Sequence, residues 1–254
     1  MRSLAMFLVV TALASCGWTT RSSATASAPA ASRAVTVAPT TTPTSTPTPT
    51  PTASPAVRYV AIGASDTVGI GATDPATGSW PARVAALLPA GSAFVNLGVS
   101  GSVAIQAKDA QLPGAIAQKP TVVSIWLAVN DMNATIEPAS YKSALAAIVD
   151  GLVARTDAKI FLGNVPDVRG VPAYKDVDKN ALFQQITAYN DVIAQIVRSA
   201  PGRVFAVDLF TGSALLVSTI TVSGDGFHPS DEGYKLIAER FTTAMRAAGV
   251  PLRP

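Results

Sequence analysis

The stretch Val122-Val123-Ser124-Ile125-Trp126-Leu127 is the clearest indicator of the fold. It is a short, β-rich run that is almost continuously apolar, instead of alternating between apolar and polar residues. A strand of this composition suits burial on both faces, as in a parallel sheet covered by helices. The run therefore predicts an α/β protein.

Similar runs occur on either side of it, and segments with helical spacing lie between them. The expected strands are 57–62, 92–97, 121–127, 159–162 and 203–209, and the expected helices are 80–88, 103–110, 139–154, 179–198 and 230–248. Regular alternation of strands and helices predicts a mostly parallel sheet with helices on both faces. We therefore expect a single α/β sandwich.

Charge and composition exclude several classes of function. All 16 acidic residues lie from residue 57 onward, together with all but three of the 19 basic residues, so this part is formally neutral. A nucleic-acid-binding domain usually shows a basic excess or a basic run, and we expect no nucleic-acid partner. One cysteine and one histidine do not support an internal disulfide or a metal cluster, and we expect no metal or organic cofactor.

The N-terminal residues have the features of an export signal. Arg2 precedes the uncharged, mostly apolar run 4–13, which is about half the length that a membrane-spanning helix needs. The following Leu13-Ala14-Ser15-Cys16 resembles a bacterial lipobox, which implies that residues 1–16 form a lipoprotein signal and that Cys16 carries the lipid. Ordinary cleavage after Ala14, leaving Cys16 as a free thiol in a secreted protein, is the alternative.

Residues 17–56 predict a tether and not a folded domain. Ser, Thr, Ala and Pro dominate the segment, and such a composition buries too little apolar surface to fold. We therefore expect a disordered linker at 17–56 and a monomeric domain at 57–254. The lipid anchor would hold that domain on the extracytoplasmic side of a bacterial envelope membrane.

The loops after the expected strands hold residues that can build a serine hydrolase. In open α/β sheets the ligand site lies outside the carboxyl ends of the strands. Ser65 follows the first strand, and a serine becomes a strong nucleophile when a neighbouring base takes its proton. His228 is the only histidine, and Asp225 lies three residues earlier, close enough to orient the imidazole.

A tetrahedral intermediate also needs hydrogen-bond donors for its oxyanion. Candidate donors are the backbone amides of Ser65 and Gly101 and the side-chain amide of Asn130, which follow three different strands. Taken alone, each of these residues is of a type that is common in turns and helix caps. Their joint order along the chain is what favours an enzyme.

Ser after the first strand, Gly after the second, Asn after the third and a late D-x-x-H resemble the SGNH hydrolases, also called the GDSL esterase/lipase family. The resemblance covers the whole expected domain and includes Trp80-Pro81 after the first block. It implies a flavodoxin-like three-layer sandwich with a five-stranded parallel sheet. It further implies a triad of Ser65, Asp225 and His228, with Ser65, Gly101 and Asn130 forming the oxyanion hole.

Two blocks depart from the family pattern. The first reads G-A-S-D in place of G-D-S-L, so that Ala64 and Asp66 differ, and the third has Ala128 in place of glycine. Neither change touches a group that transfers a proton or binds the oxyanion. The added methyl of Ala128 bears more on how the acyl chain is accommodated.

Two classes of function remain open at this point. The first is a carboxylic-ester hydrolase with an acyl-enzyme on Ser65, acting on a small ester, an acetylated glycan or a lipid. The second is a non-catalytic cell-surface module that holds a glycan or lipid in the same cleft. The segment 164–167 after the fourth strand is either part of the substrate groove or a plain turn. Gly69-Ile70-Gly71 begins like a dinucleotide motif, but Asp74 occupies the position of its third glycine.

Overall fold

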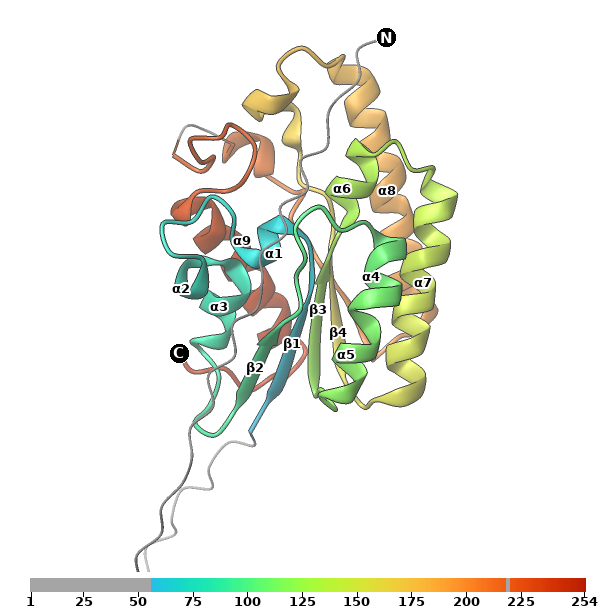
Figure 1. Ribbon diagram of the computed structural model, residues 1–254, viewed down its shortest axis with the longest axis vertical. Coiled ribbons are helices and arrows are strands. Elements are labelled where there is room, and N and C mark those ends of the chain that lie inside the picture. Colours follow the sequence, from blue (N-terminus) through green and yellow to red (C-terminus); the bar gives the residue numbers. More distant parts are fainter. Residues whose placement is uncertain (1–55, 218–219) are drawn as a thin grey trace, which may run out of the picture. The chain divides into compact units, whose positions relative to one another are not determined.

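The computed structural model describes residues 56–217 and 220–254. Five parallel strands form one sheet in the order β2-β1-β3-β4-β5 (Figure 1). They are β1 (Arg58–Gly63), β2 (Ala93–Asn96), β3 (Val122–Trp126), β4 (Lys159–Gly163) and β5 (Val204–Val207). The predicted α/β class, with a five-stranded parallel sheet, is confirmed.

Helices cover both faces of the sheet, with α4, α5, α7 and α8 on one face and α3 and α9 on the other (Figure 1). The α-helices are α1 (Ser65–Val68), α2 (Pro75–Gly78), α3 (Trp80–Ala85), α4 (Ala104–Ala110), α5 (Leu112–Ala117), α6 (Ala128–Asn133), α7 (Pro138–Arg155), α8 (Lys179–Ser199) and α9 (Asp231–Ala247). Three short 3₁₀ helices, η1 (Val168–Gly170), η2 (Pro172–Tyr174) and η3 (Ser213–Leu215), lie in the segments after β4 and β5.

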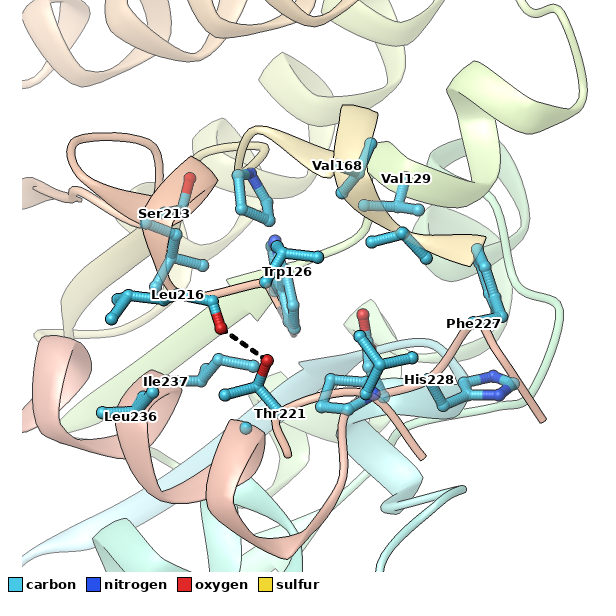
Figure 2. A pocket seen from close by; sticks show the side chains of 18 of the residues that line it. Trp126, Val129, Val168, Ser213, Leu216, Thr221, Phe227, His228, Leu236 and Ile237 are labelled. Atoms are coloured by element: carbon cyan, nitrogen blue, oxygen red, sulfur yellow. Dashed lines mark hydrogen bonds between the residues drawn. The ribbon is translucent and has the colours of Figure 1, made fainter. Parts of the chain in front are cut away.

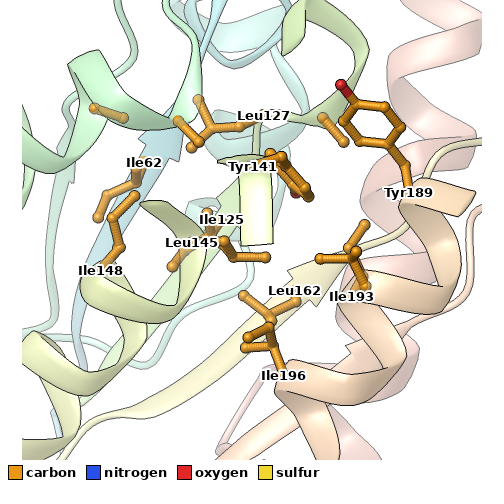
Figure 3. Close-up of a cluster of buried hydrophobic side chains, with 14 of the residues drawn as sticks. Ile62, Ile125, Leu127, Tyr141, Leu145, Ile148, Leu162, Tyr189, Ile193 and Ile196 are labelled. Carbon is orange, nitrogen blue, oxygen red and sulfur yellow. The ribbon is translucent and has the colours of Figure 1, made fainter. Parts of the chain in front are cut away.

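Successive residues of each strand enter two different cores. On β1, Val60 and Ile62 face the core under α7 and α8, which Figure 3 shows, whereas Tyr59 and Ala61 face the core under α3 and α9. In the second core, Trp80 stacks on Phe241 with ring centroids 4.1 Å apart. Burial on both faces explains why the strands are apolar throughout and do not alternate.

Parallel pairing brings the carboxyl ends of all five strands to one edge of the sheet. The register pairs Gly63 at the end of β1 with Trp126 at the end of β3, and Gly163 of β4 with Val207 of β5. Gly63 also allows α1 to pack directly against the strand end, because a Cβ there would lie 1.9 Å from Thr67 Oγ1. The segments that follow the strands therefore converge on one surface.

The predicted strands and the five predicted helices agree with the structure to within a few residues. The prediction that 63–66 and 128–131 are loops was wrong, because α1 begins at Ser65 and α6 at Ala128. Helices of four to six residues are too short to show a periodic pattern. The predicted signal peptide with Cys16, and the predicted linker up to residue 55, lie outside the described residues. Within the described part, no helix is long and apolar enough to cross a membrane.

Candidate active site

Ser65 is the first residue of α1 and stands directly above the end of β1. The last residue of β2 holds this helix in place through its side chain. Asn96 donates from Nδ2 to the Thr67 carbonyl at 2.7 Å and accepts from the Gly98 amide at 2.9 Å. The turn that carries Ser65 is thus tied to the neighbouring strand.

The structure brings Ser65, His228 and Asp225 into one hydrogen-bonded chain. The distance between His228 Nε2 and Ser65 Oγ is 2.9 Å, and that between His228 Nδ1 and Asp225 Oδ2 is 2.6 Å. Both distances lie within the range expected for a nucleophile, its base and the group that orients the base. Residues 163 positions apart in the sequence meet here through the fold alone.

The loop before α9 sets the relative positions of Asp225 and His228 locally. The Ser223 amide donates to the His228 carbonyl at 2.8 Å, and Gly226 adopts a positive φ of 74° in the turn between them. Ser230 then caps α9, its Oγ accepting from the Gly233 amide at 3.2 Å. The base is therefore held between a tight turn and a helix N-terminus.

Hydrogen bonds keep the Asp225 carboxylate ionised. Burial acts to raise its pKa, but donation from the His228 ring, from Ser223 Oγ and from the amides of Phe227 and His228 outweighs this effect. The pKa of Asp225 is consequently held well below its ordinary value. A permanent negative charge beside Nδ1 would stabilise a protonated imidazole during proton transfer.

The string Gly69-Ile70-Gly71, which begins like a dinucleotide motif, has a structural role at Gly71. Its φ is +96°, and a Cβ at this position would lie 2.5 Å from the Pro229 carbonyl oxygen and 3.0 Å from His228 Cβ. The segment after α1 therefore packs directly against the loop that carries the histidine. The glycine is needed for this close approach and not for binding a phosphate.

The two further oxyanion candidates differ in position, because Asn130 lines the pocket of Ser65 and Gly101 does not. Asn130 lies in α6, lines the same pocket as Ser65 and donates from Nδ2 to the Ser102 carbonyl at 3.1 Å. Because an amide nitrogen carries two hydrogens, this bond still leaves one for a ligand. Gly101 is exposed, has a φ of +79° and is not among the residues that line the pocket.

Two buried polar residues hold these segments together, of which Gln111 was not indicated by the sequence and Asp131 was expected only as a helix cap or turn residue. Gln111 is 2% exposed and bonds to both the amide and the carbonyl of Gly63 at 3.0 Å and to Ser102 Oγ at 3.1 Å. Asp131 is 1% exposed and accepts from the Ala104 amide at 3.0 and 3.1 Å. Gln111 lies between α4 and α5, outside the helix expected at 103–110. A polar residue between two helices is usually exposed, so no sequence signal distinguished it.

Burial also changes the acidity of two carboxyl groups next to the candidate residues. It raises the pKa of Asp131 to about 6, although the Ala104 amide opposes the shift. It likewise raises the pKa of Asp66 to about 6, against hydrogen bonds from Thr67 and the nearby charge of His228. Asp66, one of the departures from the family pattern, lines the pocket beside Ser65.

The pocket at Ser65 extends along the carboxyl edge of the sheet (Figure 2). Pro166 lines it, so part of the segment 164–167 contributes to the groove. In the regions 56–217 and 220–254 there is no group of three or more His, Cys, Asp or Glu side chains placed to bind a metal ion.

The sequence profile of the GDSL-like Lipase/Acylhydrolase family matches residues 61–236. This match covers most of the chain and includes Ser65, Gly101, Asn130, Asp225 and His228. The chain belongs to this family. As a GDSL-like acylhydrolase it is a carboxylic-ester hydrolase, which is the first of the two classes that the sequence had left open.

Solved structures share the fold of this GDSL-like acylhydrolase at low sequence identity. TesA is 21% identical with a TM-score of 0.60, over 75% of this chain and 99% of TesA. A Clostridium thermocellum family 3 carbohydrate esterase is 19% identical with a TM-score of 0.58, over 76% of this chain and 96% of its own. The acetylxylan esterase Axe2 from Geobacillus stearothermophilus is 20% identical with a TM-score of 0.58, over 76% and 94%. No curated protein matches the chain.

Proposed function

We propose that the protein hydrolyses carboxylic esters through a Ser65-His228-Asp225 triad and an acyl-enzyme intermediate. The observation that supports this most directly is the continuous chain of hydrogen bonds from Ser65 Oγ through the His228 ring to Asp225. The oxyanion would bind to the Ser65 and Gly101 amides and the Asn130 side-chain amide.

The reaction has two steps, acylation of Ser65 and hydrolysis of the acyl-enzyme, and His228 accepts and returns one proton in each. Ser65 Oγ attacks the ester carbonyl carbon while its proton passes to His228 Nε2, and the resulting imidazolium is stabilised by Asp225. Collapse of the tetrahedral intermediate breaks the bond to the alcohol oxygen, which takes the proton from His228 and leaves. A water molecule then gives a proton to His228 and attacks the acyl carbon. Collapse of this second tetrahedral intermediate breaks the bond to Ser65 Oγ, which takes the proton back from His228 as the acid leaves.

The direct test compares the purified protein with its Ser65→Ala variant on p-nitrophenyl acetate and octanoate. We expect turnover to fall by at least about a thousandfold, since loss of a serine nucleophile removes the covalent route. A fluorophosphonate probe should label the parent and not the variant. Ser143→Ala, which changes an exposed serine on α7, is the matched control and should retain activity and labelling.

We also propose that the domain is held at a bacterial envelope membrane through lipid on Cys16. The support is the sequence alone, namely the short apolar run, the lipobox-like Leu13-Ala14-Ser15-Cys16 and the Pro- and Thr-rich segment after it. Expression in bacteria with radiolabelled palmitate should label the parent and not Cys16→Ser. Equal release of both proteins into the medium would instead support ordinary cleavage and secretion.

A further inference from the structure

The cavity beside Ser65 continues well beyond the catalytic side chains. Figure 2 shows Phe227 and His228 at one end, and Leu216 and Leu236 at the other, with Trp126 between them. The cavity has a volume of about 140 Å³. Its walls come from the segments after β4 and β5 and from the first turns of α9. A group attached to Ser65 therefore has space for several non-hydrogen atoms beyond the catalytic side chains.

Apolar side chains make up most of the walls away from Ser65. They include Val168, Val171, Leu209, Leu216, Val217 and Ile237. A wall of this kind favours hydrocarbon, because burial of apolar surface is the main attraction that it offers. Carbohydrate would lose its hydrogen bonds to water on entering and would regain few of them.

Four polar side chains deeper in the cavity are already engaged within the protein, and Arg240, which also lines it, donates to the Thr211 carbonyl at 3.1 Å. Trp126, Tyr174, Ser213 and Thr221 each donate their hydrogen to a protein oxygen, at distances between 2.6 and 3.2 Å. The bond from Thr221 Oγ1 to the Leu216 carbonyl is the dashed line in Figure 2. A sugar ring placed here would have to displace such bonds, whereas an alkyl chain leaves them intact.

We propose that this cavity binds the acyl chain, and that the preferred substrates are esters of medium- or longer-chain fatty acids and not acetylated sugars. This inference rests on the proposed function, because Ser65 marks the end of the cavity where the acyl carbon is held. Each methylene that the chain buries should raise kcat/KM about fourfold until the cavity is filled. The oxyanion donors then fix the carbonyl while the cavity selects the length.

The first experiment varies the two halves of the ester separately. One series is p-nitrophenyl acetate, butyrate and octanoate, which differ only in the acyl group, and the other is the acetates of ethanol, butanol and octanol. We expect kcat/KM to rise at least about tenfold from acetate to octanoate in the first series. In the second series we expect less than about threefold, because the alcohol does not enter the cavity.

The second experiment fills the far end of the cavity. Leu236→Trp and, on the opposite wall, Leu216→Trp should each lower the octanoate-to-acetate ratio of kcat/KM at least about tenfold. Glu239→Trp adds the same bulk to an exposed position of α9 and should keep the parent ratio. Circular dichroism and melting curves identify a variant that has not folded, in which case the other tryptophan variant decides the result.

The outcomes separate failure of this inference from failure of the triad. If a fluorophosphonate labels Ser65 but kcat/KM is independent of acyl length, or follows the alcohol instead, the acyl-chain site is wrong and the triad stands. Faster release of acetate from acetylated xylo-oligosaccharides than of octanoate from its p-nitrophenyl ester would also overturn it. If neither ester is hydrolysed and Ser65 is not labelled, the proposed function itself is wrong.

Discussion

The two walls of the site are built in opposite ways. The wall proposed for the oxyanion, here called the oxyanion wall, consists of Asn130 with Ser102, Gln111 and Asp131 behind it. Ser102 bonds to both Asn130 and Gln111, and Asp131 accepts from the Ala104 amide. The acyl wall is formed mainly by the apolar residues after β4 and β5 and on α9. The polar side chains among them, such as Trp126 and Tyr174, donate their hydrogens to protein oxygens. Directional bonds fix the position of individual atoms, whereas apolar packing sets only a shape. We therefore expect substitutions in the oxyanion wall to change rate and stability, and those in the acyl wall to change specificity.

The largest effect in this comparison is expected at Asn130. Asn130→Ala removes a donor that we assign to the oxyanion and should lower kcat about 10²- to 10³-fold, with a smaller change in KM. Steady-state kinetics on p-nitrophenyl butyrate measure both constants. Asn130→Asp keeps the size of the side chain but places a carboxylate at the oxyanion, so it should be at least as impaired. A change of less than about threefold in both variants would remove Asn130 from the oxyanion hole.

The next effect concerns Gln111, whose side chain connects Gly63 at the end of β1 to Ser102 after β2. Gln111→Leu leaves the amide and carbonyl of Gly63 buried without their partners, which should lower the free energy of unfolding by about 2–4 kcal/mol. Urea denaturation measures this loss. Gln184→Leu, the same change at an exposed position of α8, should alter it by no more than about 0.5 kcal/mol. Equal stability of the two variants would contradict the role of Gln111.

A smaller effect, dependent on pH, is expected at Asp131. Its pKa is raised from the ordinary value of 3.8 to about 6, so the folded state binds the proton more tightly than the unfolded state. The resulting contribution to stability is complete below about pH 3.8 and is lost as the pH rises through about 6. Asp131→Asn cannot ionise and should lack this loss.

Denaturation of the parent and of Asp131→Asn between pH 4 and pH 7 provides the measurement. The stability of the parent relative to the variant should decline over this interval by an amount on the order of 1–2 kcal/mol. A relative stability that instead increased with pH would mean that the folded protein favours the ionised carboxylate. The buried bond to the Ala104 amide would then dominate over desolvation.

The smallest effect is expected next to the acyl wall. Leu215 is 91% exposed, is not among the residues that line the cavity, and follows the buried Ser213 in η3. Leu215→Ser should change the free energy of unfolding by less than about 0.5 kcal/mol and leave hydrolysis of soluble esters at the parent rate. A fall of several degrees in Tm would show that this leucine packs against the wall after all.

The sequence predicted the strands and longer helices because each carries a repeating pattern that local physics imposes. Apolar runs marked β1 to β5, and three- and four-residue spacing marked α8 and α9. The short helices α1 and α6 have no such pattern, so the segments with Ser65 and Asn130 were assigned to loops. The burial of Gln111 and Asp131 was missed for a related reason, because polar residue types predict exposure unless a distant partner is known.

The order of Ser65, Gly101, Asn130, Asp225 and His228 along the chain was enough to indicate the family and the class of reaction. That order says nothing about distance, and only the parallel pairing of the strands brings His228 Nε2 to within 2.9 Å of Ser65 Oγ. The shape and polarity of the acyl wall were likewise decided by tertiary structure. Its residues come from segments on either side of α8 in the sequence, and burial is a property of the packed chain that no local pattern contains.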